Sequence, residues 1–224
     1  MNMQYREIAL INERLKVAHS PYIATIRTKF FKAERDFFQQ HIQNSSVLIA
    51  GSGRGDDSLW LAKHNRLVIG IEIFPQLISA AMERKRNKEV SNITFVQGDF
   101  FDIPFQNNSF DAAVLNMGTI SDFEAPERIK LILELCRVTN KVFMDFYPST
   151  LEILKIRRRM YEEEGFLNVQ IKDTTIVSSD GLYSCSISEK EFAALAKHVG
   201  INVQFYPFSR IAIMAEIAKK EERQ

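Results

Sequence analysis

The sequence predicts an α/β protein with a doubly wound, mostly parallel, seven-stranded sheet that includes a terminal antiparallel strand. Short apolar runs alternate with helical segments, which is typical of a parallel sheet with helices on both faces. Closely spaced glycines link the first of these runs to the helix that follows it. The last two runs, 202–206 and 211–217, are joined too closely for a helical crossover, so they must be antiparallel neighbours.

Length and composition fit one large domain, or one domain with an appendage. The chain has 224 residues, and 46% of them are apolar, which is enough for a full core. A formal net charge of +1 gives no general attraction to nucleic acid or to anionic membranes. Cys136 and Cys185 lie far apart without metal-ligand spacing, the N-terminus lacks a signal-peptide pattern, and no apolar run is long enough to span a bilayer. We therefore expect a cytoplasmic protein with reduced cysteines and no membrane association.

Residues 1–45 are predicted to form N-terminal helices that pack on the main domain or over its site. One helix is expected over residues 3–18, and a second begins at Ser20-Pro21, where proline favours a helix start. This second helix is amphipathic, with one side formed by Ile23, Ile26, Phe30, Phe37 and His41.

Residues 46–224 are predicted to form the main domain. Strands are expected over residues 47–50, 67–71, 93–97, 111–116 and 141–147, with helices over residues 58–63, 75–88 and 126–138. An insertion near residues 150–187 is expected to cover the sheet, with a helix over 150–164 and strands over 169–177 and 183–187. A helix over 189–199, stopped by Gly200, precedes the two closing strands.

The segment from Val47 to Glu72 carries the strongest functional signal. An apolar run opens into Gly51, Gly53 and Gly55, and a second apolar run ends in the acid Glu72. This order predicts a strand, a tight glycine turn, a helix and a second strand with a carboxylate at its tip. A βαβ unit of this kind brings backbone close to a nucleoside and holds its ribose.

The acids that follow the glycines restrict which nucleoside fits. A dinucleotide fingerprint would place its third glycine at position 56, where this chain has Asp56, followed by Asp57. Two carboxylates at the first turn of the helix would repel a pyrophosphate, but not an adenosyl sulfonium, which is positive at sulfur and has no phosphate. The alternative is that the glycines only make a turn and that Asp56 caps the helix.

Further motifs appear in order along the chain. They are the Gly51-Ser-Gly-Arg-Gly55 loop, Glu72 at the end of a strand, the run from Gly98 to Phe105 and the run from Ser109 to Val114. With these motifs the segment from Val47 to Ala218 resembles the class I, Rossmann-like S-adenosylmethionine-dependent methyltransferases. One departure is clear, because the family usually has an acid two residues before the first glycine and this chain has Ile49.

The resemblance implies a set of cofactor-binding residues. Glu72 would accept hydrogen bonds from both ribose hydroxyls, and Asp99 would accept one from the adenine amino group; the alternatives are an exposed strand-end acid and a turn carboxylate. The full set implied for S-adenosylmethionine is Gly51, Ser52, Gly53, Gly55, Glu72, Ile73, Asp99, Phe100 and Asn116. Because Ile49 cannot act as the usual acid, other residues must bind the loop or the methionine end of the cofactor in its place.

The predicted reaction is in-line methyl transfer to a small molecule or a small peptide, with no metal required. Alignment in a dry pocket supplies much of the rate of such a displacement. Asp145 lies in an apolar strand and is a candidate general base, a ligand for a substrate amine, or a satisfied structural acid. The acceptor pocket is expected at the carboxyl ends of the fourth and fifth strands, with contacts from Tyr22, Met117, Tyr147 and Tyr183.

Two alternative functions are weighed against this interpretation. One is a non-catalytic partner subunit that only binds the adenosyl cofactor, which Ile49 favours and the intact Glu72 and Asp99 oppose. The other is an RNA methyltransferase that uses the arginine cluster 157–159, although such a cluster is usually a solvated helix face. The sequence does not fix the oligomeric state.

Overall fold

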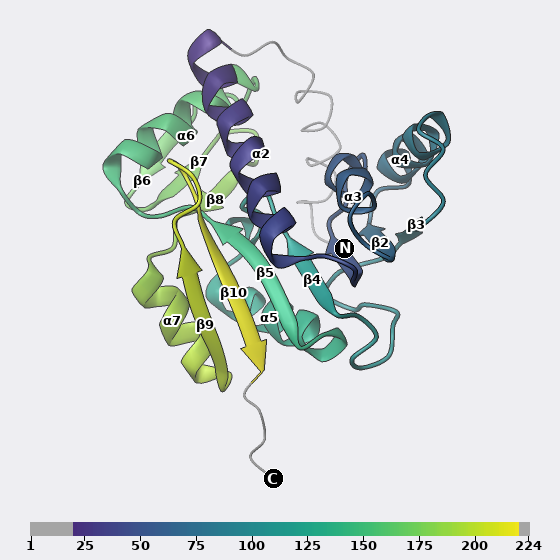
Figure 1. The fold of residues 1–224 in the computed structure, drawn as a ribbon. Helices are drawn as coiled ribbons and strands as arrows, with labels where there is room; N and C mark the ends of the chain where they lie inside the picture. The colour runs from purple at the N-terminus through teal and green to yellow at the C-terminus, as the bar shows by residue number, and fades with distance from the viewer. Residues whose placement is uncertain (1–19, 220–224) are drawn as a thin grey trace.

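A seven-stranded sheet forms the centre of the molecule, in the order β3-β2-β1-β4-β5-β10-β9 (Figure 1). The computed structural model describes residues 20–219. The pairings among β1 to β5 are parallel, whereas β10 runs antiparallel to both β5 and β9. The strands are β1 (Ser46–Ala50), β2 (Leu67–Glu72), β3 (Ile93–Gln97), β4 (Ala112–Leu115), β5 (Lys141–Phe146), β9 (Ile201–Tyr206) and β10 (Ile213–Lys219). The predicted sheet, with its terminal antiparallel strand, is confirmed.

Helices cover both faces of this sheet. They are α2 (Pro21–His41), α3 (Asp56–Leu61), α4 (Pro75–Asn87), α5 (Ala125–Val138), α6 (Leu151–Glu163), α7 (Glu189–His198) and a short 3₁₀ helix, η1 (Thr119–Asp122). Alternate residues of a strand point to opposite faces. Val47 and Ile49 therefore pack with α2, α3 and α4, while Leu48 and Ala50 pack with α5 and α7. In Figure 1, α2 lies in front of the sheet and α5 behind it.

Helix α2 begins where the sequence predicts. The Ser20 hydroxyl accepts a hydrogen bond from the Ile23 amide, and Pro21 follows in the first turn. The predicted apolar side is buried, but it also contains one acid, Glu34. The helix expected over residues 3–18 lies outside the described residues, so the division into an appendage at 1–45 and a main domain stays a prediction.

A small second sheet and α6 form the cover. The strands β6 (Gln170–Lys172), β7 (Thr175–Val177) and β8 (Tyr183–Cys185) pair antiparallel in this order. The prediction of a single strand over 169–177 is wrong, because Asp173 has a left-handed backbone with φ of 54° and turns the chain. The expected strand over 183–187 also ends earlier, at Cys185. The cover has its own apolar core, which contains Leu154, Phe166, Val169, Ile176 and Leu182.

Two glycines with similar left-handed backbones but different surroundings allow the effect of packing to be measured. Gly55 has φ of 79° and Gly200 has φ of 73°. A Cβ on Gly55 would lie 2.6 Å from the Phe95 ring, whereas a Cβ on Gly200 would have no atom within 4 Å. We expect Gly200→Ala to cost about 1–2 kcal/mol of unfolding free energy, from the backbone alone. Gly55→Ala should cost roughly 1–3 kcal/mol more, because the core must also shift. Urea unfolding measures both, and equal losses would contradict this account.

Candidate active site

The glycine loop, residues 51–55, connects β1 to α3 at the carboxyl end of the sheet. Gly51 and Gly53 have φ of 71° and 52°, a region in which any side chain is strained. The Ser52 amide donates to the Ile71 carbonyl at 2.8 Å, which holds the loop against β2. The Phe100 ring lies 3.6 Å from the point where a Cβ on Gly51 would be. The loop therefore presents backbone rather than side chains beside the end of β2.

Glu72 ends β2 next to this loop and is held by backbone amides. Its Oε2 accepts a hydrogen bond from the Gly53 amide at 2.9 Å. Its Oε1 accepts from the amides of Ile73 and Phe74 at 2.9 and 3.1 Å. The residue is only 6% exposed. Since a carboxylate has about four acceptor sites, these bonds fix its orientation and still leave capacity for a ligand.

Asp99 and Phe100 follow β3, the neighbour of β2. The Asp99 Oδ1 accepts a hydrogen bond from the Phe101 amide at 2.8 Å, so the carboxylate does stabilise its own turn. The Phe100 ring packs on Phe101 and Phe123, with centroids 5.2 and 5.9 Å away. The turn and the aromatic cluster form a rigid wall beside Gly51. The adenine-binding role of Asp99 and Phe100 stays a prediction.

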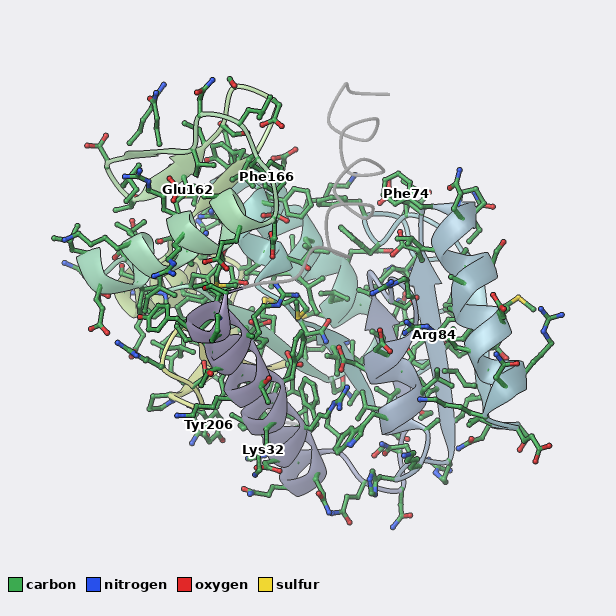
Figure 2. All side chains as sticks on the ribbon, turned by 90° about the horizontal axis from the view of Figure 1, so that it is seen from above. Lys32, Phe74, Arg84, Glu162, Phe166 and Tyr206 are labelled. Carbon is green, nitrogen blue, oxygen red and sulfur yellow. The ribbon has the colours of Figure 1, made fainter. Side chains whose placement is uncertain are left out.

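A cavity of about 730 Å³ lies between α2, α3 and the glycine loop. Its walls include Ile49, the loop residues Gly51 to Gly53, Asp57 on α3, and Asn116 and Met117 after β4. The α2 side contributes the cations Arg27, Lys32 and Arg35. Figure 2 shows Lys32 on α2 and Arg84 on α4, with α3 between the two helices. Glu72, Asp99 and Phe100 do not line this cavity, whereas Gly53, whose amide donates to Glu72, does.

The two aspartates at the start of α3 have different surroundings. The Asn116 amide donates to Asp57 Oδ2 at 2.8 Å, and the Arg35 guanidinium lies 3.5 Å from Oδ1, which accepts no hydrogen bond. Burial raises the pKa of Asp57, and Arg35 opposes this effect. Asp56 is exposed and forms an ion pair with Arg84. The residue at the helix cap is Gly55, with no side-chain cap bond, so the alternative in which Asp56 caps α3 is wrong.

The segment after β4 is positioned by two side chains of the β5 end. Both oxygens of the buried Asp145 accept from the Gly118 amide at 3.0 Å, and the Tyr147 hydroxyl donates to the Met117 carbonyl at 3.1 Å. A Cβ on Gly118 would lie 2.1 Å from the Tyr147 ring, so only glycine fits there. Burial raises the pKa of Asp145 to about 7, although the Gly118 amide lowers it. Asp145 and Tyr147 thus position residues 116–118, and the general-base role of Asp145 stays a prediction.

Glu34 is a buried acid on α2 that the sequence analysis missed, and it does not line the cavity. It is 0% exposed on the inner side of α2, and neither carboxylate oxygen has a hydrogen-bond partner among the described residues. Burial raises its pKa well above the usual range, and Asp57 and Asp145 raise it further, against the lowering effect of Arg35. A signal was present, because Glu34 lies four residues after Phe30 and three before Phe37, on the apolar stripe.

The remaining predicted acceptor contacts are dispersed. Met117 lines the cavity and is 36% exposed. Tyr22 is 42% exposed at the start of α2, and the Arg159 guanidinium lies 5.1 Å from its ring centroid. Tyr183 is half-buried at the start of β8. Neither tyrosine lines the cavity, and their contact with an acceptor stays a prediction.

The arginine cluster 157–159 is not a uniformly solvated face, so that expectation is wrong for Arg157. Arg157 is 1% exposed, and its guanidinium lies 4.1 Å from the Tyr147 ring centroid. It donates to the hydroxyls of Ser186 and Ser184 at 2.7 and 2.6 Å. Arg158 and Arg159 are exposed and pair with acids four residues later. Arg157 therefore connects α6, the β8 region and Tyr147.

Comparison with known proteins finds similarity to methyltransferases over part of the chain. Residues 47–141 match a family described as a methyltransferase domain. A demethylmenaquinone methyltransferase of Porphyromonas gingivalis is 32% identical over 101 residues, which are 43% of this chain and 40% of that protein. A ubiquinone/menaquinone biosynthesis C-methyltransferase of Citrifermentans bemidjiense is 29% identical over 117 residues, which are 49% and 48% of the two chains. The chain thus spans less than half the length of these curated relatives.

Solved structures share the fold over more of the chain. A protein of Pyrococcus horikoshii superposes with a TM-score of 0.70 at 22% identity, over 87% of this chain and 91% of that one. The magnesium protoporphyrin IX methyltransferase of Synechocystis, solved with bound SAH (S-adenosylhomocysteine), superposes with a TM-score of 0.63 at 15% identity. This match covers 98% of this chain and 89% of that one.

The sheet order, the glycine loop and the acid at the end of β2 define an α/β protein with a Rossmann-like fold. More narrowly, residues 47–141 match the methyltransferase-domain family, and the chain has the fold of the class I S-adenosylmethionine-dependent methyltransferases. Within residues 20–219, no helix has the length and apolar character needed to cross a membrane. In the same part of the chain, no group of three or more acidic, histidine or cysteine side chains is placed to hold a metal ion.

The buried acids predict an unusual dependence of stability on pH. The pKa of Asp145 is raised from 3.8 to about 7, so the folded state binds more protons than the unfolded state between these values. The unfolding free energy should therefore fall as pH rises through this window, by at most about 4 kcal/mol for this group. Glu34 contributes in the same direction. Urea unfolding between pH 4 and pH 8 measures the slope, which Asp145→Asn should reduce.

Asp111 is the control, because its pKa is shifted in the opposite direction from that of Asp145. Its carboxylate accepts hydrogen bonds from Ser46 and pairs with Arg66, and its pKa is lowered. The stability that it contributes is present above the unfolded pKa and is lost as pH falls. Asp111→Asn should leave the slope between pH 4 and pH 7 in place. A wild-type protein whose stability rises steadily over this range would contradict the assignment of raised pKa values.

Proposed function

We propose that this protein is a cytoplasmic S-adenosylmethionine-dependent methyltransferase that acts on a small-molecule acceptor. The observation that carries the proposal is the carboxylate of Glu72, fixed by three backbone amides beside a glycine loop whose helix begins with two acids. A fixed carboxylate suits the two hydroxyls of a ribose. Acids at the start of α3 disfavour a pyrophosphate there. The named relatives, all methyltransferases, support the same reaction class.

The residues present fit this cofactor. Left-handed glycines let the backbone approach it, Glu72 and the adjacent Ile73 face its ribose side, and the Asp99–Phe100 turn forms a wall for the adenine. On the cavity side, Asp57 Oδ1 lies 3.5 Å from the Arg35 guanidinium and accepts no hydrogen bond among the described residues. A buried carboxylate oxygen without a hydrogen bond is costly, which favours a site that a ligand completes. Ser52, Gly55 and Asn116 complete the proposed cofactor site by shaping the loop and the cavity.

Bound S-adenosylmethionine would supply a methyl group on a positively charged sulfur. The chain's own contribution is to place the acceptor in line with that group and to exclude water. Met117 and Gly118 are held in left-handed conformations, with φ of 62° and 68°, by Tyr147 and Asp145. We assign Tyr22, Met117, Tyr147 and Tyr183 to acceptor binding. Asp145 is the proposed proton acceptor for nucleophiles that must lose a proton, since its pKa of about 7 suits a base at neutral pH.

Glu72 gives the direct test of cofactor binding. Glu72→Ala should raise the Kd for S-adenosylhomocysteine at least tenfold, because charge-assisted hydrogen bonds are worth about 1.5–3 kcal/mol each. Glu83→Ala, at an exposed position of α4, should leave the Kd unchanged. Isothermal titration calorimetry measures both values. Equal affinity of the two variants would contradict the assignment of Glu72 to the ribose hydroxyls.

A methyl-transfer assay distinguishes an active enzyme from a subunit that only binds the cofactor. Protein incubated with methyl-labelled S-adenosylmethionine should transfer label to a small molecule. Quinones are the first class to test, because one relative is named for demethylmenaquinone and another for ubiquinone/menaquinone biosynthesis. Asp145→Asn should lower kcat by roughly a hundredfold with little change in the KM for the cofactor, if a proton must be removed. Asp111→Asn should retain full kcat. Tight cofactor binding without transfer to any small molecule would favour the non-catalytic alternative.

A further inference from the structure

Arg157 is a buried cation at the junction between the cover and the end of β5. It is 1% exposed, and its terminal nitrogens donate to the hydroxyls of Ser186 and Ser184 at 2.7 and 2.6 Å. Its Nε has no hydrogen-bond partner among the described residues. Loss of hydration raises the pKa of Asp122 on η1 to about 7, and the Arg157 charge opposes this rise. The position of Arg157 needs a reason beyond filling space, because an apolar side chain would avoid the cost of burying a charge.

The Tyr147 ring is the surface over which this guanidinium lies. The guanidinium carbon of Arg157 is 4.1 Å from the ring centroid, which is a close cation–π contact. The Tyr147 hydroxyl donates to the Met117 carbonyl at 3.1 Å, and the Tyr147 carbonyl accepts from the Ile187 amide at 2.9 Å. The ring also fills the space that a Cβ on Gly118 would need. The ring therefore cannot turn without moving either the guanidinium or its hydroxyl contact.

The Met117–Gly118 peptide has both of its polar groups bound by side chains of the β5 end. Its carbonyl accepts from Tyr147, and its amide donates to both oxygens of Asp145 at 3.0 Å. Both residues of the peptide have left-handed backbones, which cost free energy to hold. Met117 lines the cavity. The orientation of this one peptide therefore decides where a wall of the cavity lies.

Resting on the proposed function, we propose that Arg157 is a positioning residue for methyl transfer, which acts through the Tyr147 ring on the Met117–Gly118 peptide. The serines of the cover fix the guanidinium, the guanidinium fixes the ring, and the hydroxyl of the ring fixes the carbonyl. Strands β1 and β4 lie between β5 and β2 in the sheet. A change at Arg157 should therefore leave the contacts of Glu72, at the end of β2, intact.

The first test observes the Met117–Gly118 peptide by itself. These residues form the only Met-Gly pair in the sequence, so carbonyl-labelled methionine and nitrogen-labelled glycine together give one carbonyl–amide peak in an NMR spectrum. Tyr147→Phe should move the carbonyl resonance to lower frequency, because the carbonyl loses its donor. Arg157→Met should move it in the same direction, because the ring is no longer fixed. The double variant should move it no further than Tyr147→Phe alone, and a sum of the two shifts would contradict action through Tyr147.

Two control variants separate positioning from a general loosening of the cover. Arg158→Met changes the neighbouring, exposed arginine of α6, which pairs with Glu162, and should leave the peak in place. Leu154→Ala removes a buried side chain from the cover's own apolar core on the same helix. It should lower the thermal unfolding temperature and still leave the peak in place. If Leu154→Ala shifts the peak as far as Arg157→Met does, Arg157 only holds the cover together and the proposal is overturned.

A second variant covers the case in which Arg157→Met does not fold, as judged by its thermal unfolding. Ser186→Ala keeps the guanidinium but removes one of the acceptors that fix it. It should shift the Met117–Gly118 peak in the same direction as Tyr147→Phe. An unmoved peak in a folded Ser186→Ala protein would overturn the proposal.

The second test compares S-adenosylmethionine with S-adenosylhomocysteine, which lacks the methyl group and the charge on sulfur. Calorimetry should give Arg157→Met a Kd for S-adenosylhomocysteine within about twofold of the wild-type value. In wild-type protein the Met117–Gly118 peak should differ between the two bound states, because this peptide borders the methyl group. The difference should shrink in Arg157→Met, in which the peptide is less firmly held.

The outcomes distinguish this inference from the function on which it rests. If wild-type protein binds neither ligand, the proposed cofactor is wrong, whereas the first test still decides whether Arg157 acts on the peptide. If both ligands bind and the peak is the same in the two bound states, the role of Arg157 in methyl transfer is overturned while the cofactor stands. A tenfold or larger loss of S-adenosylhomocysteine affinity in Arg157→Met would also overturn it, because the effect would then lie on cofactor binding.

Discussion

The contact between the Glu72 carboxylate and the Gly53 amide is the interaction on which the glycine loop depends. Glu72 lies at the end of β2 and the loop at the end of β1, so this bond fixes the spacing of two strand ends. The amides of Ile73 and Phe74 fix the second oxygen and remove its freedom to rotate. A ligand that binds Glu72 meets a carboxylate that is already oriented. Its binding therefore does not carry the entropy cost of ordering that side chain.

Hydrogen bonds from side chains at the end of β5 hold the strained backbone that follows β4. Met117 is a non-glycine residue with φ of 62°, and the Tyr147 ring fills the space that a side chain at Gly118 would need. The amide of Gly118 and the carbonyl of Met117 are both hydrogen-bonded to β5-end side chains. Burying the Asp145 carboxyl there costs stability at neutral pH. Such a cost is common at functional sites, where a required geometry outweighs stability.

Local patterns in the sequence were sufficient for most of the fold. The β1 to β3 unit could be predicted because each step depends on residues close in sequence: apolar runs, left-handed glycines and a terminal acid. Charged residues on a helix usually face water, so the burial of Arg157 could not be predicted in this way, and the position of Glu34 on an apolar stripe was the only local signal for its burial. Their burial depends on partners far away in the sequence, such as Asp57, Asp145 and Ser184. The hairpin at Asp173 was missed because an aspartate can adopt a left-handed backbone without a glycine to signal it.

Helix α2 connects the cover with the main sheet and also forms one wall of the cavity. The start of α2 is attached to the cover, because the Ser20 amide and hydroxyl donate to Glu163 and Arg27 pairs with Glu164. Its last turns pack on the sheet through Phe37 and Phe38. Between these two attachments, Phe31 and Arg35 of the same helix line the cavity. Because one helix contacts the cover, the sheet and the cavity, the packing of the cover helps to set the position of this cavity wall.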